Sequence, residues 1–233
     1  MLAYVIEAPP IHANAGNYFL AALGFYRLGY VVERFKLSTL KTLDVNADTP
    51  VFGGMESLEG VLPSYQGLSH YPAELRSFLH RTVAIRDIEA VQPGEFFKPL
   101  ESQQKLFLPR VKDRSFQCEL LLDKIPAGTR VWVSSAVKFL AEYRVYVRRG
   151  QVLNVCFYKG DPLIQPEVGA IAAMVSATKS CAVAYAIDVG VLESGETALV
   201  ELSDFCCLGN YGLKAIDYAA CFAERWAEVW QDT

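Results

Sequence analysis

The stretch "AIDVGVLESGETALVELSDF", residues 186–205, has the pattern of a β-hairpin that turns at Ser194-Gly195. Folding the stretch about those two residues brings apolar side chains together on one face, in the pairs Val191 with Ala198, Val189 with Val200, and Ile187 with Leu202. The other face then carries Asp188 directly opposite Glu201. Side chains in such a pair have Cβ atoms about 4.5–5.5 Å apart, and like charges at that separation repel. The hairpin therefore predicts a positive group bound between two carboxylates.

The residues around this pair favour a divalent metal as the positive group. Two carboxylates on adjacent strands offer hard oxygen donors, and Mg²⁺ often takes one or two carboxylates together with nucleotide phosphates. Ser203 lies on the same face as Glu201, and Asp204 follows at the end of the strand. The alternative is that both carboxylates point into solvent from an edge hairpin. Against it, the same face also carries Ala186, Gly190 and Leu199, so it is not uniformly polar.

Composition limits the classes of protein to consider. At 233 residues and 52% hydrophobic composition, the chain can bury one large core or two smaller ones. A formal net charge of −4 argues against nucleic-acid binding. No apolar run reaches the roughly 18 residues that span a membrane, and "MLAYVIEAPP" lacks the basic start of a signal peptide. Six cysteines without a CxxC pair and three scattered histidines argue against a thiolate or imidazole metal site. We expect a cytoplasmic protein with reduced cysteines.

The organisation of the chain changes near residue 90. Before it, residues 2–6 read as a strand, "GNYFLAALGFYRLGY" as a helix and "VVERFK" as a second strand. This order predicts a small N-terminal α/β lobe over residues 1–90. Residues 91–233 contain mostly paired strands, among them a hairpin "EYRVYVRRGQVLNVCFYKGD" that turns at Arg149-Gly150. The final segment, "KAIDYAACFAERWAEVW", predicts an amphipathic helix.

Several basic side chains occur where apolar residues would be expected. Strand alternation in "EYRVYV" puts Glu142 and Arg144 on one face. They could form a surface ion pair of little energetic value, or the guanidinium could bind phosphate or carboxylate oxygens. Lys98 lies in the apolar strand "FFKPL", so its ammonium must reach solvent or an anion. Lys105 lies in the polar stretch "ESQQKLF", which could form a loop over a ligand.

The order of these pieces resembles the ATP-grasp superfamily, and most closely its small members related to ribosomal-protein glutamate ligases. The motifs that carry the resemblance are "FFKP", "EYRVYV", "AIDVGV", "ALVELSDF" and "LGNYGL", within residues 90–213. The resemblance implies an α+β, ATP-grasp fold in which a small N-terminal α/β lobe precedes two antiparallel-sheet lobes that clasp the nucleotide. P-loop and Rossmann folds have no support, because no Walker A or GxGxxG string is present.

The resemblance also implies roles for individual residues, with ATP and Mg²⁺ as cofactors. Lys98 and Lys105 would bind the phosphates, and Arg144 would point toward the phosphoryl group that is transferred. Glu142 would lie near the ribose or the hinge, and Asp188 and Glu201 would bind magnesium. The backbone of "WVSS" would lie against adenine, and its residues are Trp132, Val133, Ser134 and Ser135.

Two positions depart from the family pattern. Ser203 stands where the family usually has a metal-binding asparagine, and Ser135 stands where relatives often have a hinge glutamate. A serine hydroxyl is a shorter and weaker oxygen ligand, so water or Asp204 would have to complete the metal's coordination. These departures bear on magnesium binding and on the affinity for adenine.

The function that the resemblance implies is an ATP-dependent carboxylate–amine ligase. It would form an amide through an acyl-phosphate and release ADP and phosphate. The carboxylate and the amine acceptor are left open between small molecules, peptides and proteins. The alternative is a nucleotide-binding or protein-interaction module that has lost ligase activity, which the two serines favour. A kinase acting on a small hydroxyl compound is a third possibility, without a candidate base.

Overall fold

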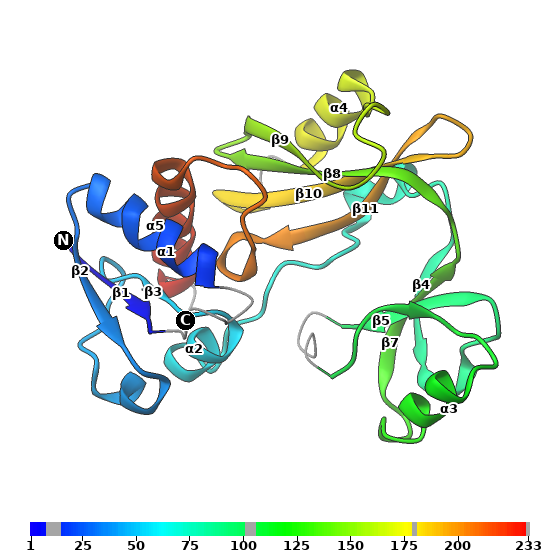
Figure 1. Cartoon of the computed structure of the whole chain (residues 1–233), viewed down its shortest axis with the longest axis horizontal. Coiled ribbons are helices and arrows are strands. Elements are labelled where there is room, and N and C mark those ends of the chain that lie inside the picture. The colour runs from blue at the N-terminus through cyan, green and yellow to red at the C-terminus, as the bar shows by residue number, and fades with distance from the viewer. Residues whose placement is uncertain (8–14, 101–105, 179–180, 232–233) are drawn as a thin grey trace.

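The protein, in a computed structural model that describes residues 1–7, 15–100, 106–178 and 181–231, folds into three sheets with helices packed against them (Figure 1). The strands are β1 (Leu2–Ile6), β2 (Val31–Phe35), β3 (Val51–Phe52), β4 (Val83–Asp87), β5 (Glu95–Pro99), β6 (Arg110–Val111), β7 (Arg130–Ser135), β8 (Phe139–Arg148), β9 (Gln151–Gly160), β10 (Ala184–Leu192) and β11 (Thr197–Asp204). The α-helices are α1 (Ala15–Arg27), α2 (Met55–Val61), α3 (Phe116–Leu122), α4 (Val168–Thr178) and α5 (Ala215–Gln231). Short 3₁₀ helices are η1 (Leu37–Thr42), η2 (Ala73–Phe78), η3 (Ile88–Ala90) and η5 (Phe205–Cys207).

The sheets differ in size and in strand direction. A parallel sheet has the strand order β2-β1-β3. The first antiparallel sheet has the order β4-β7-β5-β6, and the second has the order β11-β10-β8-β9. This arrangement confirms the α+β class expected from the sequence. β4 precedes residue 90, yet it pairs with β7 and so belongs to the first antiparallel sheet.

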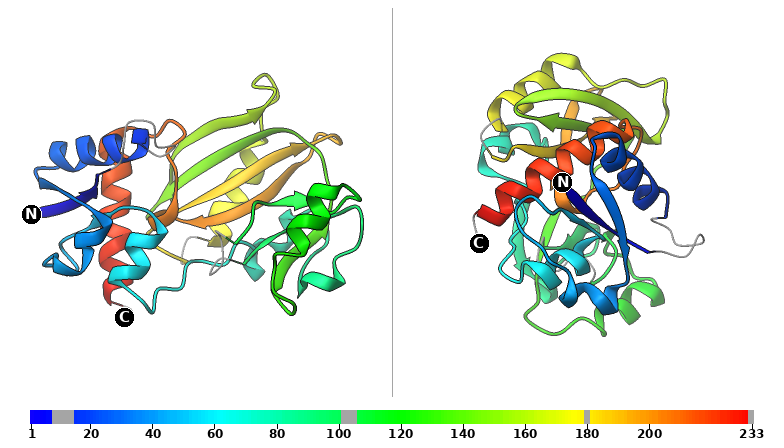
Figure 2. Two further views of the ribbon diagram at one scale, coloured as in Figure 1. Left: turned by 60° about the horizontal axis from the view of Figure 1, so that its bottom comes forward. Right: turned by 90° about the vertical axis from the view of Figure 1, so that its left-hand side faces the viewer.

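The N-terminal lobe is closed by the last helix of the chain. Figure 2 shows α5 lying beside α1 and the parallel sheet, with both chain ends on this lobe. Gly24 makes the close approach of the two helices possible, because a Cβ atom there would lie 2.0 Å from the carbonyl oxygen of Ala215. Phe25 and Phe222 meet edge to face across this interface, and Trp226 extends the core. The predicted amphipathic helix at the C-terminus is thus part of the N-terminal core.

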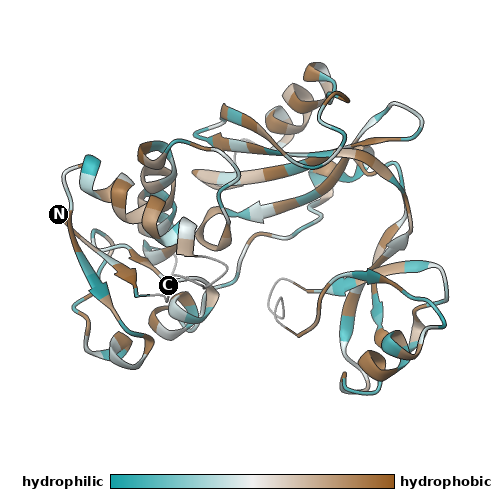
Figure 3. Ribbon diagram, viewed as in Figure 1, coloured by the Kyte–Doolittle hydropathy of each residue, from teal (hydrophilic) through white to brown (hydrophobic). Residues whose placement is uncertain are grey.

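The second antiparallel sheet is the most deeply buried part of the molecule. Every residue of β10 is buried, and α4 covers one face of the sheet (Figure 1). Apolar segments run along β8 and α4 in Figure 3. The β8–β9 hairpin turns at Arg149 and Gly150, both with positive φ, as the sequence predicted. The other face of the sheet carries the polar residues described below.

The hairpin of β10 and β11 differs from its predicted register in one half. The turn has three residues, with Gly195 at a φ of +89°, and the Leu192 amide donates to the Glu196 carbonyl at 2.9 Å. Val191 therefore pairs with Thr197 and Val189 with Leu199, so the predicted pairs Val191–Ala198 and Val189–Val200 are wrong. A β-bulge then restores the register, and the predicted pairs Asp188–Glu201 and Ile187–Leu202 are confirmed.

The bulge places Val200 on a cavity instead of in the predicted apolar face. Bulges commonly turn a side chain toward a functional site. The guanidinium of Arg81 donates to the carbonyl oxygens of Leu199 and Val200, at 2.5 and 2.9 Å. Arg81 precedes β4, so these bonds tie the start of the first antiparallel sheet to the second.

Two further observations bear on the sequence-based expectations. None of the helices in the described parts of the chain is long and apolar enough to cross a bilayer. All six cysteines are described, and all are free thiols.

Candidate active site

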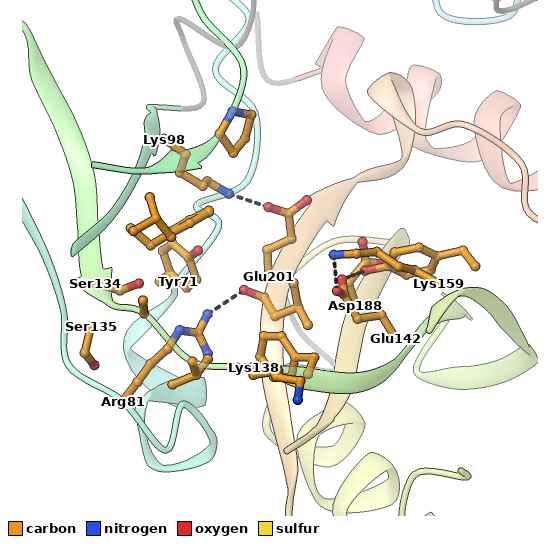
Figure 4. A pocket seen from close by; sticks show the side chains of 18 of the residues that line it. Tyr71, Arg81, Lys98, Ser134, Ser135, Lys138, Glu142, Lys159, Asp188 and Glu201 are labelled. Carbon is orange, nitrogen blue, oxygen red and sulfur yellow. Dashed lines mark hydrogen bonds and ion pairs between the residues drawn. The ribbon is translucent and has the colours of Figure 1, made fainter. Parts of the chain in front are cut away.

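The largest group of polar side chains lines a cavity of about 600 Å³ between the two antiparallel sheets (Figure 4). We call it the first cavity. β5 contributes Lys98, β8 contributes Glu142 and Arg144, β10 contributes Asp188, and β11 contributes Glu201. Five of the residues that the sequence assigned to binding or catalysis thus lie in one wall-to-wall cluster.

Arg144 and Asp188 form a two-point ion pair. They are direct partners across β8 and β10, and Nε and Nη2 of Arg144 donate to Oδ1 and Oδ2 of Asp188, both at 2.7 Å. Their side chains are only 9% and 4% exposed. Burial raises the pKa of Asp188 to about 6, although Arg144 opposes that shift. Burial alone would lower the pKa of Arg144, but the Asp188 carboxylate outweighs it and raises that pKa.

Lys98 and Glu201 form a second ion pair across the cavity. Figure 4 shows the ammonium of Lys98 pointing at the Glu201 carboxylate. Lys98 is buried, and its nitrogen also lies 5.0 Å from the centre of the Tyr71 ring, in a cation–π contact. Burial alone would raise the pKa of Glu201, but Lys98 and His70 outweigh it and lower that pKa to about 2. The anion that the sequence required for Lys98 is therefore Glu201.

These pairs correct the picture of two carboxylates that repel each other around one shared cation. Asp188 and Glu201 do lie opposite each other on β10 and β11. Each of them, however, already has its own basic partner on a neighbouring strand. The sequence could not show this, because it does not reveal that β8 pairs with β10 or that β5 faces β11.

Glu142 has two partners from β9. Its carboxylate accepts a hydrogen bond from the Tyr158 hydroxyl at 2.8 Å and from the Lys159 ammonium at 2.5 Å. Glu142 is buried, whereas the Lys159 side chain is 69% exposed. The Glu142 carboxylate is thus fixed at the edge of the cavity.

Aromatic residues missed by the sequence-based argument complete the lining. Tyr211 lies 4.7 Å from the Arg144 guanidinium in a cation–π contact and stacks on Tyr158 at a ring separation of 5.0 Å. Arg144 also donates to the Gly209 carbonyl at 3.1 Å. Tyr211 belongs to the motif "LGNYGL", which was the available signal for it. Tyr71 and Arg81 also line the cavity, without such a signal.

The predicted adenine-binding segment only partly lines the cavity. Ser134 and Ser135 lie in the lining, and two following residues, Ala136 and Val137, join them. Trp132 lies outside the lining and packs edge to face on Tyr71 at 4.9 Å. Val133 is buried in the core of the first antiparallel sheet. The predicted phosphate ligand Lys105 falls outside the described residues.

The donor set of Asp188 and Glu201 is compatible with Mg²⁺. Both are carboxylates at one level of the sheet, and magnesium commonly takes one or two carboxylates and completes its shell with water and phosphate oxygens. Within the described residues, no cluster of three or more His, Cys, Asp and Glu side chains could hold a metal by itself. Ser203 Oγ lies 3.4 Å from Glu201 Oε1, but Ser203 lines a neighbouring cavity and not the first cavity. Asp188 and Glu201 therefore fit a magnesium ion that arrives with a phosphate ligand.

The comparisons with known proteins agree with this geometry. A family model described as an "ATP-grasp domain", the second family of its clade, matches residues 78–221, more than half of the chain. A comparison with curated proteins gave no match.

Solved structures with similar folds cover nearly the whole chain. D-cycloserine synthetase DcsG matches with a TM-score of 0.61 and 12% identity, over 97% of this chain and 100% of its own. D-alanine–D-alanine ligase from Bacillus anthracis matches with a TM-score of 0.60 and 11% identity, over 100% and 99%. A RimK domain ATP-grasp protein from Sphaerobacter thermophilus matches with a TM-score of 0.51 and 13% identity, over 98% and 99%. At these identities, the likeness shows the fold.

Proposed function

The chain belongs to the ATP-grasp family, and from this premise we propose that it is an ATP-dependent carboxylate–amine ligase that releases ADP. The expected ATP-grasp fold and the expected relation to the ribosomal-protein glutamate ligases are confirmed. The reaction and the residues that perform it are our proposal.

One observation carries the proposal: two acidic and two basic side chains meet in the first cavity as two ion pairs, Arg144–Asp188 and Lys98–Glu201. A nucleotide with its metal brings the same charges in the opposite places. Its phosphates can take the guanidinium and the ammonium, while the metal can take the two carboxylates. The cavity would then exchange internal ion pairs for ligand contacts without leaving a buried charge unpaired.

The nucleotide would lie along the cavity from the hinge to this cluster. Ser134 to Val137, together with Val200 from the bulge, supply backbone groups and an apolar side chain for the base. Glu142 lies at the edge of the cavity, where a carboxylate can accept hydrogen bonds from ribose hydroxyls. We propose Lys98 and Lys105 as the phosphate ligands.

In the reaction, an oxygen of the substrate carboxylate attacks the γ-phosphorus, and the bond to the β-phosphate oxygen breaks with its electron pair leaving on ADP. The attacking amine then forms a bond to the acyl carbon, phosphate leaves, and the amine loses a proton. Magnesium held by Asp188 and Glu201 would neutralise phosphate charge when bound. Arg144 presents a planar fork that matches the oxygens of the transferred group, where charge spreads during transfer.

The test is ADP release in the presence of ATP, magnesium and a panel of carboxylic acids, with hydroxylamine as the amine. Hydroxylamine converts an acyl-phosphate to a hydroxamate, which is detected by its colour with iron(III) and by mass. We expect at least one acid to give both ADP and hydroxamate, and Asp188→Asn to abolish both. Tight nucleotide binding without ADP release for any acid, peptide or protein acceptor would instead support a binding module that has lost ligase activity.

A further inference from the structure

A second cavity of about 290 Å³ adjoins the first at the catalytic cluster. The two cavities share Lys98, Arg144, Glu201 and Tyr211. Reacting atoms must come within about 3–3.5 Å of each other before transfer. If the first cavity holds ATP with its γ-phosphate at Arg144, the group that attacks that phosphate has to approach from a space that also reaches Arg144. The second cavity meets this requirement.

The residues that line the second cavity but not the first include His70, Ser203 and Cys207. The main chain of His70 is fixed against β11, because its carbonyl accepts the Leu202 amide at 2.9 Å, and the residue is only 6% exposed. Ser203 follows on β11, and Cys207 lies in η5. The walls are therefore built on fixed backbone from three separate segments.

The polar groups of this lining favour an anionic ligand. The Asp204 carboxylate is already bound by Arg225, which donates to both of its oxygens, and by the Cys206 amide. The Glu201 carboxylate is bound by Lys98. The other polar side chains, including His70, Arg144 and Ser203, carry N–H or O–H donors. A ligand rich in acceptor oxygens matches such a surface.

The volume limits the ligand to a small one. Pockets for drug-sized ligands run from about 300 to 1,000 Å³, so the second cavity is at the bottom of that range. A single amino acid or a dicarboxylic acid of similar size suits it better than a peptide segment of several residues.

Resting on the proposed ligase activity, we propose that the second cavity binds the carboxylate substrate, that this substrate is a small acid of amino-acid size, and that His70 donates a hydrogen bond to it. His70 is then a specificity-determining residue for the acid, while the nucleotide is bound by different residues. Cys207 limits the size of the acid from the opposite segment.

The experiment measures binding of acids and nucleotide separately. Single amino acids of both configurations and small dicarboxylic acids are titrated calorimetrically into protein saturated with magnesium and ADP. The variants are His70→Phe, which removes the donors and keeps a ring, and Cys207→Phe, which fills the cavity. Cys181→Phe makes the same substitution at an exposed cysteine outside both linings and is the matched control. Thermal melting identifies any variant that fails to fold.

We expect at least one acid to bind the parent protein, and both cavity variants to weaken it at least tenfold. The dissociation constant of magnesium-ADP should change less than threefold, and Cys181→Phe should change neither. If Cys207→Phe does not fold, His70→Phe alone decides the result. Acid binding that is unaffected by a folded cavity variant, or no binding by any acid in the panel, would overturn the inference.

The ligase proposal fails in a distinguishable way. Acid binding that depends on His70, without hydroxamate formation from ATP, would keep the second cavity as an acid site and refute ligation. Hydroxamate formation at equal acid KM in the parent and in His70→Phe would keep ligation and refute the acid site. Reaction of C-terminal peptide carboxylates, without reaction of the free acids, would refute the small-acid class.

Discussion

Arg144 holds both carboxylate oxygens of its cross-strand partner Asp188 at 2.7 Å, in a pair that is almost fully buried. The neighbouring carboxylate, Glu201, is held by Lys98 from the opposite sheet. The cluster is therefore internally balanced in charge. Each substitution in it exposes the partner that is left behind, and the first three predictions follow from this.

Asp188→Asn should destabilise the protein in metal-free buffer. From the sequence alone, the substitution would relieve repulsion and leave stability unchanged or slightly higher. In the structure it leaves the buried Arg144 guanidinium without a charged partner, and breaking a buried pair costs about 3 kcal/mol. Urea unfolding in the presence of a chelator measures this loss. Glu193→Gln, which breaks the exposed Glu193–Lys138 pair, is the control and should change stability by less than about 1 kcal/mol. Equal stability of Asp188→Asn and parent would contradict the prediction.

Lys98→Met should destabilise the protein more at about pH 7 than at about pH 4. In the parent, the pKa of Glu201 is lowered from 4.5 to about 2, so its contribution to stability is present above 4.5 and is lost as the pH falls through about 2. Without the ammonium, burial raises the pKa of Glu201, and the contribution is instead lost as the pH rises. Urea unfolding of both proteins across this range measures the difference. A stability deficit that does not depend on pH would show that Glu201 is not the group exposed by the substitution.

Arg144→Lys should lower turnover about tenfold or more, equivalent to about 1.4 kcal/mol of activation free energy. The lysine keeps the charge but cannot match the transferred phosphoryl group, or Asp188, at two points. Because that contact strengthens in the transition state, nucleotide affinity should change much less. ADP release against ATP concentration and calorimetric ADP binding give the two values. Equal losses in both would make Arg144 an ordinary phosphate anchor.

Gly24→Ala should destabilise the protein although alanine is the better helix former. The new Cβ atom would lie 2.0 Å from the Ala215 carbonyl oxygen and 2.6 Å from the Ala219 Cβ, so α1 and α5 must move apart. Overpacking of this kind costs about 1–3 kcal/mol. Gly16→Ala is the matched control in the same helix, because no atom lies within 4 Å of its new Cβ. It should leave stability unchanged or raise it by up to about 1 kcal/mol. Similar effects of the two substitutions on unfolding by urea would refute the packing argument.

Local patterns in the sequence determined the strands, their turns and the face on which each polar residue lies. The Arg149-Gly150 turn is an example, because both residues adopt the positive φ that such a turn requires. The pairing of Asp188 with Glu201 was also predictable, although the assumed turn was one residue too short. The three-residue turn shifts the register, and the bulge at Val200 shifts it back. Alternation fixes the faces over a few residues, so this pair was correct even though the pairs nearer the turn were wrong.

The tertiary structure alone decided which charges meet. Lys98 and Glu201 are separated by 103 positions in the sequence, and Arg144 and Asp188 by 44. Nothing in either segment specifies that β8 lies beside β10 or that β5 lies across the cavity from β11. The same holds for Tyr211 over Arg144 and for His70 beside Glu201. Spacing along the chain specifies conformation through local sterics and hydrogen bonding, whereas these contacts arise when separate segments bury their apolar faces in common cores.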